Sequence, residues 1–176
     1  LTTSQIGQLT TTEVRAFSTV QAGAFTATQI GGLTTTAVAN FSTTQLNALT
    51  TTQTRGLTTA QLNGLTQANL DALDASKFST TQVSGLNTTS VSNLTTTQVA
   101  ALTTAEVGAL TTAQIGTLTT TEVRAFSTAQ AGAFTATQIG GLTTTQVGNF
   151  STTQLNALSI DSLDAVDLTK ISTSQP

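Results

Sequence analysis

The sequence predicts an all-α solenoid of short capped helices, with one helix in each eight-residue repeat. Three observations lead to this fold class. An octad close to Leu-Thr-Thr-x-Gln-Val-x-Ala recurs along almost the whole chain. Positions 1 and 6 of the octad are apolar, and positions 2 and 5 carry the pattern of a helix-capping box.

Positions 1 and 6 form an apolar ladder that we expect to build the core. Position 6 of one octad and position 1 of the next are three residues apart, so they lie on one face of a helix. The residues expected in this core include Leu9, Val14, Phe17, Phe25, Ile30, Phe126, Phe134, Ile139 and Phe150.

Positions 2 and 5 are predicted to start each helix. Position 2 is almost always Ser or Thr, whose side-chain oxygen accepts a hydrogen bond from an unpaired backbone N–H at a helix start. Position 5 is mostly Gln or Glu, which returns the interaction in a capping box. The pairs expected to cap are Thr10 with Glu13, Thr103 with Glu106, and Thr119 with Glu122. Position 8 is often Gly or Asn, which suits a left-handed helix end.

One continuous helix is excluded by its geometry. At about 100° per residue, eight residues overshoot two turns by roughly 80°, so the apolar stripe would wind around the whole helix. A β-solenoid is the alternative fold, because Thr, Val, Ile and Phe favour strands. Positions 1 and 6 have opposite parity, however, and a straight strand would point them to opposite faces. The capping pattern therefore favours helices.

The sequence also contains a longer duplication, which spans several octads. Residues 118–158 nearly copy residues 9–49, at an offset of 109 residues. A five-residue word at 73–77 breaks the octad register, and a similar word occurs at 166–170. We therefore predict one module at 1–77, truncated at its N-terminal end, a second at 78–170, and the start of a third module or a tail at 171–176. Leu1 falls in mid-pattern, so we expect the chain to belong to a longer protein.

The composition argues against most functional classes. Charged residues make up 7% of the chain, against about 25% in typical domains, and the net charge is −3. There is no basic patch for nucleic acid, and no apolar run of the length of a membrane span. With no His and no Cys, an ordinary catalytic triad is excluded. We expect no catalytic residue and no cofactor, and hence no enzyme.

Several acidic residues gather near the predicted module joints. Carboxylate oxygens are ligands that calcium prefers, and the calcium candidates are Asp71, Asp74, Asp164 and Asp167. The chain has no glycine-turned calcium loop, and Asp also caps and solvates such joints. We therefore expect no metal site.

The run LTTTQVAALTTAEVGAL at residues 94–110 resembles tandem octapeptide regions of very long bacterial exported or surface proteins, which are often described as adhesins or exoproteins. The resemblance covers almost the whole chain. It implies an extracellular or cell-surface location and a structural or adhesive role, and it brings no catalytic residue with it.

These patterns together predict a structural role. Because the chain carries few charges, little electrostatic repulsion opposes the side-by-side packing of copies. We therefore expect the chain to associate with itself, as a homopolymer or laterally, and to form a fibre, stalk or surface layer. The alternative is a Thr-rich binding surface for ice, a glycan or a cell surface. An exposed row of Thr would favour this alternative, whereas Thr engaged in helix caps would count against it.

Overall fold

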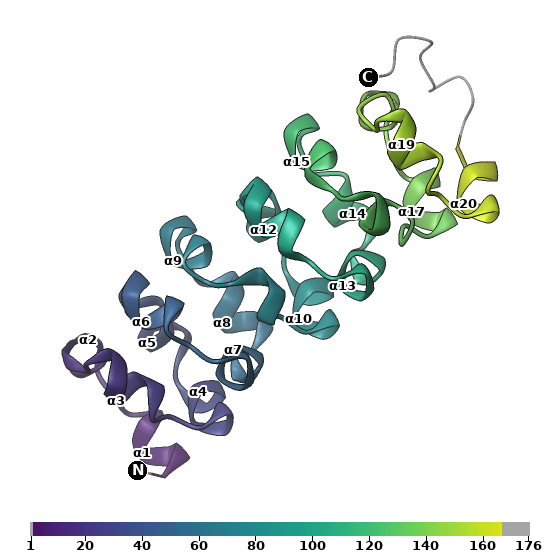
Figure 1. Cartoon of the computed structure of the whole chain (residues 1–176). Helices are drawn as coiled ribbons and strands as arrows, with labels where there is room; N and C mark the ends of the chain where they lie inside the picture. The colour runs from purple at the N-terminus through teal and green to yellow at the C-terminus, as the bar shows by residue number, and fades with distance from the viewer. Residues whose placement is uncertain (1, 167–176) are drawn as a thin grey trace. The chain divides into compact units, whose positions relative to one another are not determined.

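The structure is a computed structural model that describes residues 2–166 (Figure 1). Within that range it contains short α-helices, one 3₁₀ turn and no strand. The chain falls into two compact units, unit 1 at residues 1–86 and unit 2 at residues 87–176. The prediction of an all-α solenoid of short helices is confirmed, and the β-solenoid alternative is wrong.

Unit 1 is a series of helices of four to six residues, interrupted once by the 3₁₀ turn η1. Its elements are α1 (Thr3–Ile6), α2 (Thr11–Ala16), α3 (Thr19–Gly23), α4 (Ala27–Gly32), α5 (Thr35–Ala39), α6 (Thr43–Asn47), α7 (Thr51–Gly56), α8 (Thr59–Asn63), α9 (Gln67–Asp71), η1 (Ala75–Lys77) and α10 (Thr80–Gly85).

Unit 2 continues the same pattern over its described residues. Its helices are α11 (Thr88–Ser92), α12 (Thr96–Ala101), α13 (Thr104–Ala109), α14 (Thr112–Ile115), α15 (Thr120–Ala125), α16 (Thr128–Ala131), α17 (Ala136–Gly140), α18 (Thr144–Val147), α19 (Thr152–Leu155) and α20 (Ile160–Asp164).

Each helix starts and ends through local hydrogen bonds, as helix α2 illustrates. The Thr10 hydroxyl accepts from the backbone N–H of Glu13, and the Glu13 carboxylate accepts from the backbone N–H of Thr10 at 2.8 Å. At the other end, the Phe17 N–H donates to the Val14 carbonyl. Equivalent capping boxes form at Thr103 with Glu106 and at Thr119 with Glu122.

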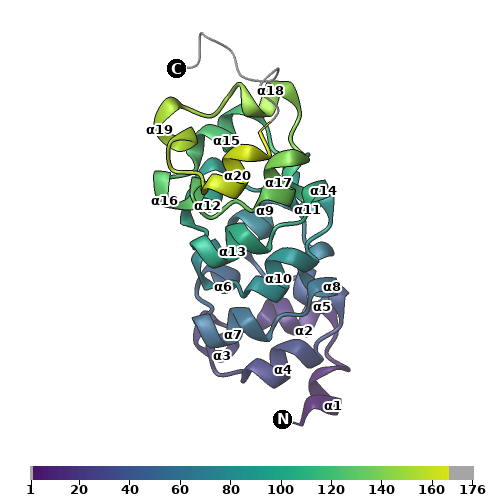
Figure 2. The ribbon, with the colours of Figure 1, turned by 90° about the vertical axis from the view of Figure 1, so that its right-hand side faces the viewer.

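Stacking supplies the stability that such short helices lack on their own. In both units the strongest contacts join a helix to the third element after it, as α4 does with α7 and α17 with α20 (Figure 2). The apolar ladder points between these helices. A turn of the solenoid therefore contains at least three octads, and within each unit a turn contacts the turns next to it.

Most of the expected core residues are buried. Val14, Phe25, Ile30, Phe126, Phe134, Ile139 and Phe150 are at most 9% exposed. The aromatic rings also touch, since Phe126 and Phe134 lie edge to face with centroids 5.1 Å apart. Leu9 and Phe17, by contrast, are only half-buried. They lie in the first turn of unit 1, where no described helix packs on the outer side.

The glycines at the helix ends have a different purpose from the one expected. No described residue, glycine included, has a positive φ, so the prediction of left-handed helix ends is wrong. Close approach between turns explains several of these glycines instead. A Cβ atom added at Gly56, the last residue of α7, would lie 2.5 Å from the carbonyl oxygen of Ala27 in α4. At Gly141, an added Cβ would collide with the side chain of Thr112.

The five-residue word at 73–77 is a shortened octad. Asp74 caps η1 by accepting from the backbone N–H of Ser76, and Leu73 is buried like any position-1 residue. The division into modules at 1–77 and 78–170 stays a prediction from the duplicated sequence. Residues 167–170, and the predicted third module or tail at 171–176, lie outside the described residues.

Candidate functional site

A row of buried glutamine side chains joins successive turns of the solenoid, and we call it the glutamine ladder. Its members occupy position 5 of the octad, are 2–6% exposed, and donate through Nε2 to backbone carbonyls of the preceding turn. They are Gln45, Gln53, Gln61 and Gln82 in unit 1, and Gln130, Gln138, Gln146 and Gln154 in unit 2.

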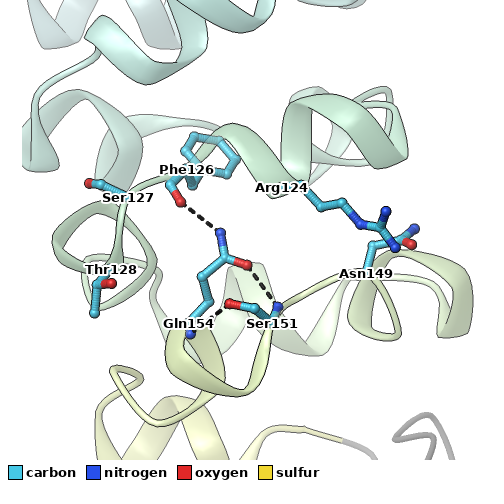
Figure 3. Close-up of a pocket in the computed structure, with 7 residues that line it drawn as sticks. All are labelled: Arg124, Phe126, Ser127, Thr128, Asn149, Ser151 and Gln154. Carbon is cyan, nitrogen blue, oxygen red and sulfur yellow. Dashed lines mark hydrogen bonds between the residues drawn. The ribbon is translucent and has the colours of Figure 1, made fainter. Parts of the chain in front are cut away.

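Gln154 shows how one side chain serves two helices (Figure 3). Its Oε1 accepts from the backbone N–H of Ser151 at 2.8 Å, which closes the capping box at the start of α19. Its Nε2 donates to the carbonyl of Phe126 at 2.7 Å and to that of Val123 at 3.2 Å. These carbonyls lie at the C-terminal end of α15, where carbonyls lack the regular intrahelical partner, and that of Val123 also accepts from the Phe126 N–H at 3.4 Å. Gln154 therefore caps the start of one helix and the end of another.

The register between turns is regular. A ladder glutamine donates to the carbonyls 28 and 31 residues before it, which are position 1 of the octad three places back and position 6 of the octad four places back. Because helices also pack on their third neighbour, one turn spans between three and four octads. The spacing falls by three residues across the five-residue word, as Gln82 donates to Thr54 and Leu57, 28 and 25 residues before it.

Other donors replace glutamine at three places. Asn69 donates to the carbonyl of Phe41, and Ser162 donates to that of Phe134 at 2.7 Å. Lys77, the last residue of the five-residue word, donates through Nζ to the carbonyl of Leu49 at 2.8 Å. All three acceptors lie 28 residues back. The five-residue word therefore keeps the ladder in place while omitting the last three positions of an octad.

The glutamates at position 5 keep the cap but cannot donate across the turn, because a carboxylate only accepts. Glu13 is exposed, whereas Glu106 and Glu122 are buried. The Glu122 carboxylate accepts from the backbone N–H of Thr119 at 2.6 Å. The ladder spacing of 28 and 31 residues places the carbonyls of Leu94 and Val91 opposite the side chain of residue 122, where a glutamine would donate to them.

Two carboxyl groups have shifted titration. The backbone N–H of Thr10, followed by its hydroxyl, lowers the pKa of Glu13 below its ordinary value by hydrogen bonding to the ionised form. The Ser76 hydroxyl is the largest cause that lowers the pKa of Asp74. The Lys77 ammonium, 3.9 Å from the Asp74 carboxylate, also lowers that pKa.

The calcium candidates are not brought together. Among residues 2–166 no group of three acidic side chains forms a cluster that could hold a metal ion. Asp74 is engaged with Ser76 and Lys77, Asp71 and Asp164 end separate helices, and Asp167 lies outside the described residues.

None of the described helices is long and apolar enough to cross a membrane.

The bonds of the glutamine ladder between turns were not foreseen from the sequence. Two features of the sequence at position 5 nevertheless point to these bonds. A capping box accepts Glu as readily as Gln, yet Gln far outnumbers Glu at position 5. The donor Lys77 also stands at position 5 of the five-residue word. Both features indicate that this position needs a donor as well as an acceptor.

Three stretches of the chain match the family model described as the ALTTAQ repeat, namely residues 1–35, 91–120 and 107–144. Together they cover just over half of the chain. They include octads of both units, with the capping boxes that begin at Thr10, Thr103 and Thr119. No match was found among curated proteins or among solved structures.

Proposed function

The chain belongs to the ALTTAQ repeat family, and from this premise we propose that it is a structural segment of a long extracellular bacterial protein. In this proposal the solenoid acts as a fibre, a stalk or a surface layer, and copies associate with one another. The observation that carries the proposal is the glutamine ladder. Within each unit it joins successive turns through backbone carbonyls, which every octad possesses.

The ladder glutamines donate to backbone carbonyls, and this kind of bonding suits a protein that acts as a long spacer or fibre. The acceptors do not depend on side-chain identity, so octads can be added or removed while the bonding between turns is preserved. The Lys77 contact to Leu49 extends this tolerance to a five-residue word. Repeated octads therefore provide reach and stiffness without requiring a unique pocket.

We further propose that the chain is not an enzyme. It contains no His and no Cys, and Glu106 and Glu122 are committed to capping boxes. These glutamates accept from backbone N–H groups, and no described basic side chain is paired with either. Both side chains serve helix starts, whereas a general acid or base acts through a perturbed group in a cleft.

Self-association is supported by the surface of the helices. Charged residues are 7% of the chain, and the exposed first turns carry neutral residues such as Thr43, Thr44, Thr152 and Thr153. Little electrostatic repulsion opposes the approach of a second copy. The position-2 Ser and Thr accept hydrogen bonds in caps, which counts against a continuous Thr-rich face for ice or a glycan and favours the structural role.

Electron microscopy of the purified chain, with sedimentation velocity over a range of concentrations, tests this proposal. We expect filaments or sheets and a sedimentation coefficient that rises with concentration. The matched variant carries Thr44→Glu and Thr153→Glu, which place like charges on exposed helix starts. It should keep the helical circular dichroism spectrum and lose assembly. Monomers at every concentration of the unaltered chain would refute self-association.

The proposed location has a separate test. Antibodies against the chain should label intact cells of the source organism without permeabilisation. Labelling that appears only after lysis would overturn the extracellular assignment while leaving the structural role to be judged by microscopy.

A further inference from the structure

Each unit has a surface hollow bordered by the same three residue types at the same places in the duplicated sequence. We call each set an Arg–Asn–Ser corner. The corners are Arg15, Asn40 and Ser42 in unit 1, and Arg124, Asn149 and Ser151 in unit 2. Every member of the second corner follows its counterpart by 109 residues. The hollows have volumes of about 390 Å³ and about 370 Å³.

The stacking of helices creates the corner. Arg124 lies in the last turn of α15, and Asn149 follows α18, which packs against α15. Ser151 is the N-cap of α19. Figure 3 shows the Arg124 side chain extending toward Asn149, with Ser127 and Thr128 on the opposite side of Gln154. The equivalent corner in unit 1 uses the packing of α2 against α5.

The corner retains unused hydrogen-bonding capacity. Within residues 2–166, the guanidinium groups of Arg15 and Arg124 make no hydrogen bond and no ion pair with another described residue. Asn149 donates through Nδ2 to the Thr120 hydroxyl at 2.9 Å, which leaves its Oδ1 as an acceptor. The Ser151 hydroxyl accepts from Gln154 and can still donate.

A third arginine at the same octad position serves as a comparison. Arg55, like Arg15 and Arg124, stands at position 7 of its octad, but its Nε donates to the carbonyl of Lys77 at 3.3 Å. Arg55 borders neither of the two hollows that contain the corners. Position 7 alone therefore does not make a corner, and Arg55 offers an internal control.

The charge and chemistry of the hollows restrict the ligand. No carboxylate borders either hollow, and each has one arginine among neutral side chains. One guanidinium pairs two parallel donors with a single carboxylate. The remaining border is rich in hydroxyl and amide groups, with Ser127 and Thr128 in unit 2 and Thr66 in unit 1. Such groups match the hydroxyls of a sugar ring.

We propose that each Arg–Asn–Ser corner binds an acidic sugar, with the arginine on the sugar carboxylate and the asparagine and serine on neighbouring ring hydroxyls. Two such sites on one chain would engage two residues of acidic polysaccharide, and binding at both would add to the overall affinity. This inference stands apart from the structural role, because it concerns a ligand and makes no use of self-association.

Selective ¹⁵N labelling of arginine tests the proposal, because the chain has three arginines and therefore three Nε–H signals. Arg15→Lys, Arg55→Lys and Arg124→Lys variants assign these signals. Titration with galacturonate should move the Arg15 and Arg124 signals and leave that of Arg55 in place, with dissociation constants on the order of 1 mM. A trigalacturonate arm distinguishes a polysaccharide source, which should bind more tightly than the free sugar acid.

Two control ligands decide the outcome. Galactose lacks the carboxylate, and acetate lacks the ring, so each should bind at least about tenfold more weakly than galacturonate. If acetate moves the Arg15 and Arg124 signals as much as galacturonate does, the arginine binds any carboxylate and the proposal is overturned. Equal movement of all three arginine signals would show general charge screening and overturn it as well.

Discussion

The Gln154→Glu substitution separates the two tasks of a ladder residue. A glutamate keeps the cap at Ser151, as Glu122 keeps the cap at Thr119 with a 2.6 Å hydrogen bond. It cannot donate to the carbonyls of Phe126 and Val123, which Gln154 reaches at 2.7 Å and 3.2 Å. The substitution therefore keeps the cap and removes the hydrogen bonds between turns.

The expected loss follows from these two bonds. Each hydrogen bond contributes about 0.5–1.5 kcal/mol net, and Gln154 is 4% exposed, so water does not readily replace them. Placing a carboxylate beside two carbonyl oxygens adds an electrostatic penalty. We expect Gln154→Glu to lower the free energy of unfolding by about 2–4 kcal/mol. Urea denaturation at neutral pH, followed by circular dichroism, measures it.

The reverse substitution provides the matched comparison. Glu122→Gln should raise the free energy of unfolding by about 1–2 kcal/mol, because a buried donor is gained opposite the carbonyls of Val91 and Leu94. Glu13→Gln should change it little, since Glu13 is exposed and only caps. If Gln154→Glu is as stable as the unaltered chain, or if Glu122→Gln and Glu13→Gln behave alike, the ladder does not join the turns as described.

Further predictions concern a buried hydroxyl, a glycine contact and a titrating cap. Thr54→Val should raise the free energy of unfolding by about 1–2 kcal/mol in the same urea assay, because the buried Oγ1 has no hydrogen-bond partner; a loss of stability would contradict this. Gly56→Ala should lower it by about 1–3 kcal/mol, since the new Cβ meets the Ala27 carbonyl, and an unchanged urea midpoint would argue against close packing there. The lowered pKa of Asp74 means that its contribution is complete above the ordinary carboxyl pKa and is lost as pH falls through the lowered value. Carboxyl ¹³C titration should therefore show a low Asp74 midpoint that rises toward its ordinary value in Ser76→Ala.

The local structure could be predicted because it depends on neighbours in the sequence. Thr10 and Glu13 are three residues apart, and their capping box needs only the backbone between them. Val14 and Phe17 share a face for the same reason. One octad thus contains enough information for one short helix, and the repetition of octads indicates a stack.

The contacts between turns could not be predicted from the octad alone. The glutamine ladder depends on how many octads complete a turn, which is set by small rotations accumulated over about 28 residues. The same unknown hid the reason for Gly56, whose partner Ala27 lies in another turn. It also made the five-residue word look like a break, although Lys77 keeps its place in the ladder.

Disulfide trapping between turns tests the central claim most directly, because the chain has no native cysteine. A Cβ at Gly141 would lie 3.3 Å from that of Thr112, near the usual disulfide range of about 3.5–4.5 Å, and Gly141 has a φ of −82° that a side chain tolerates. In the Thr112→Cys, Gly141→Cys variant, mild oxidation should form a bond within the folded chain and fail in urea. The control pair, Thr112→Cys with Gly148→Cys, should stay reduced. Equal crosslinking of both pairs, or of neither, in a chain that remains helical would contradict the stacking of turns.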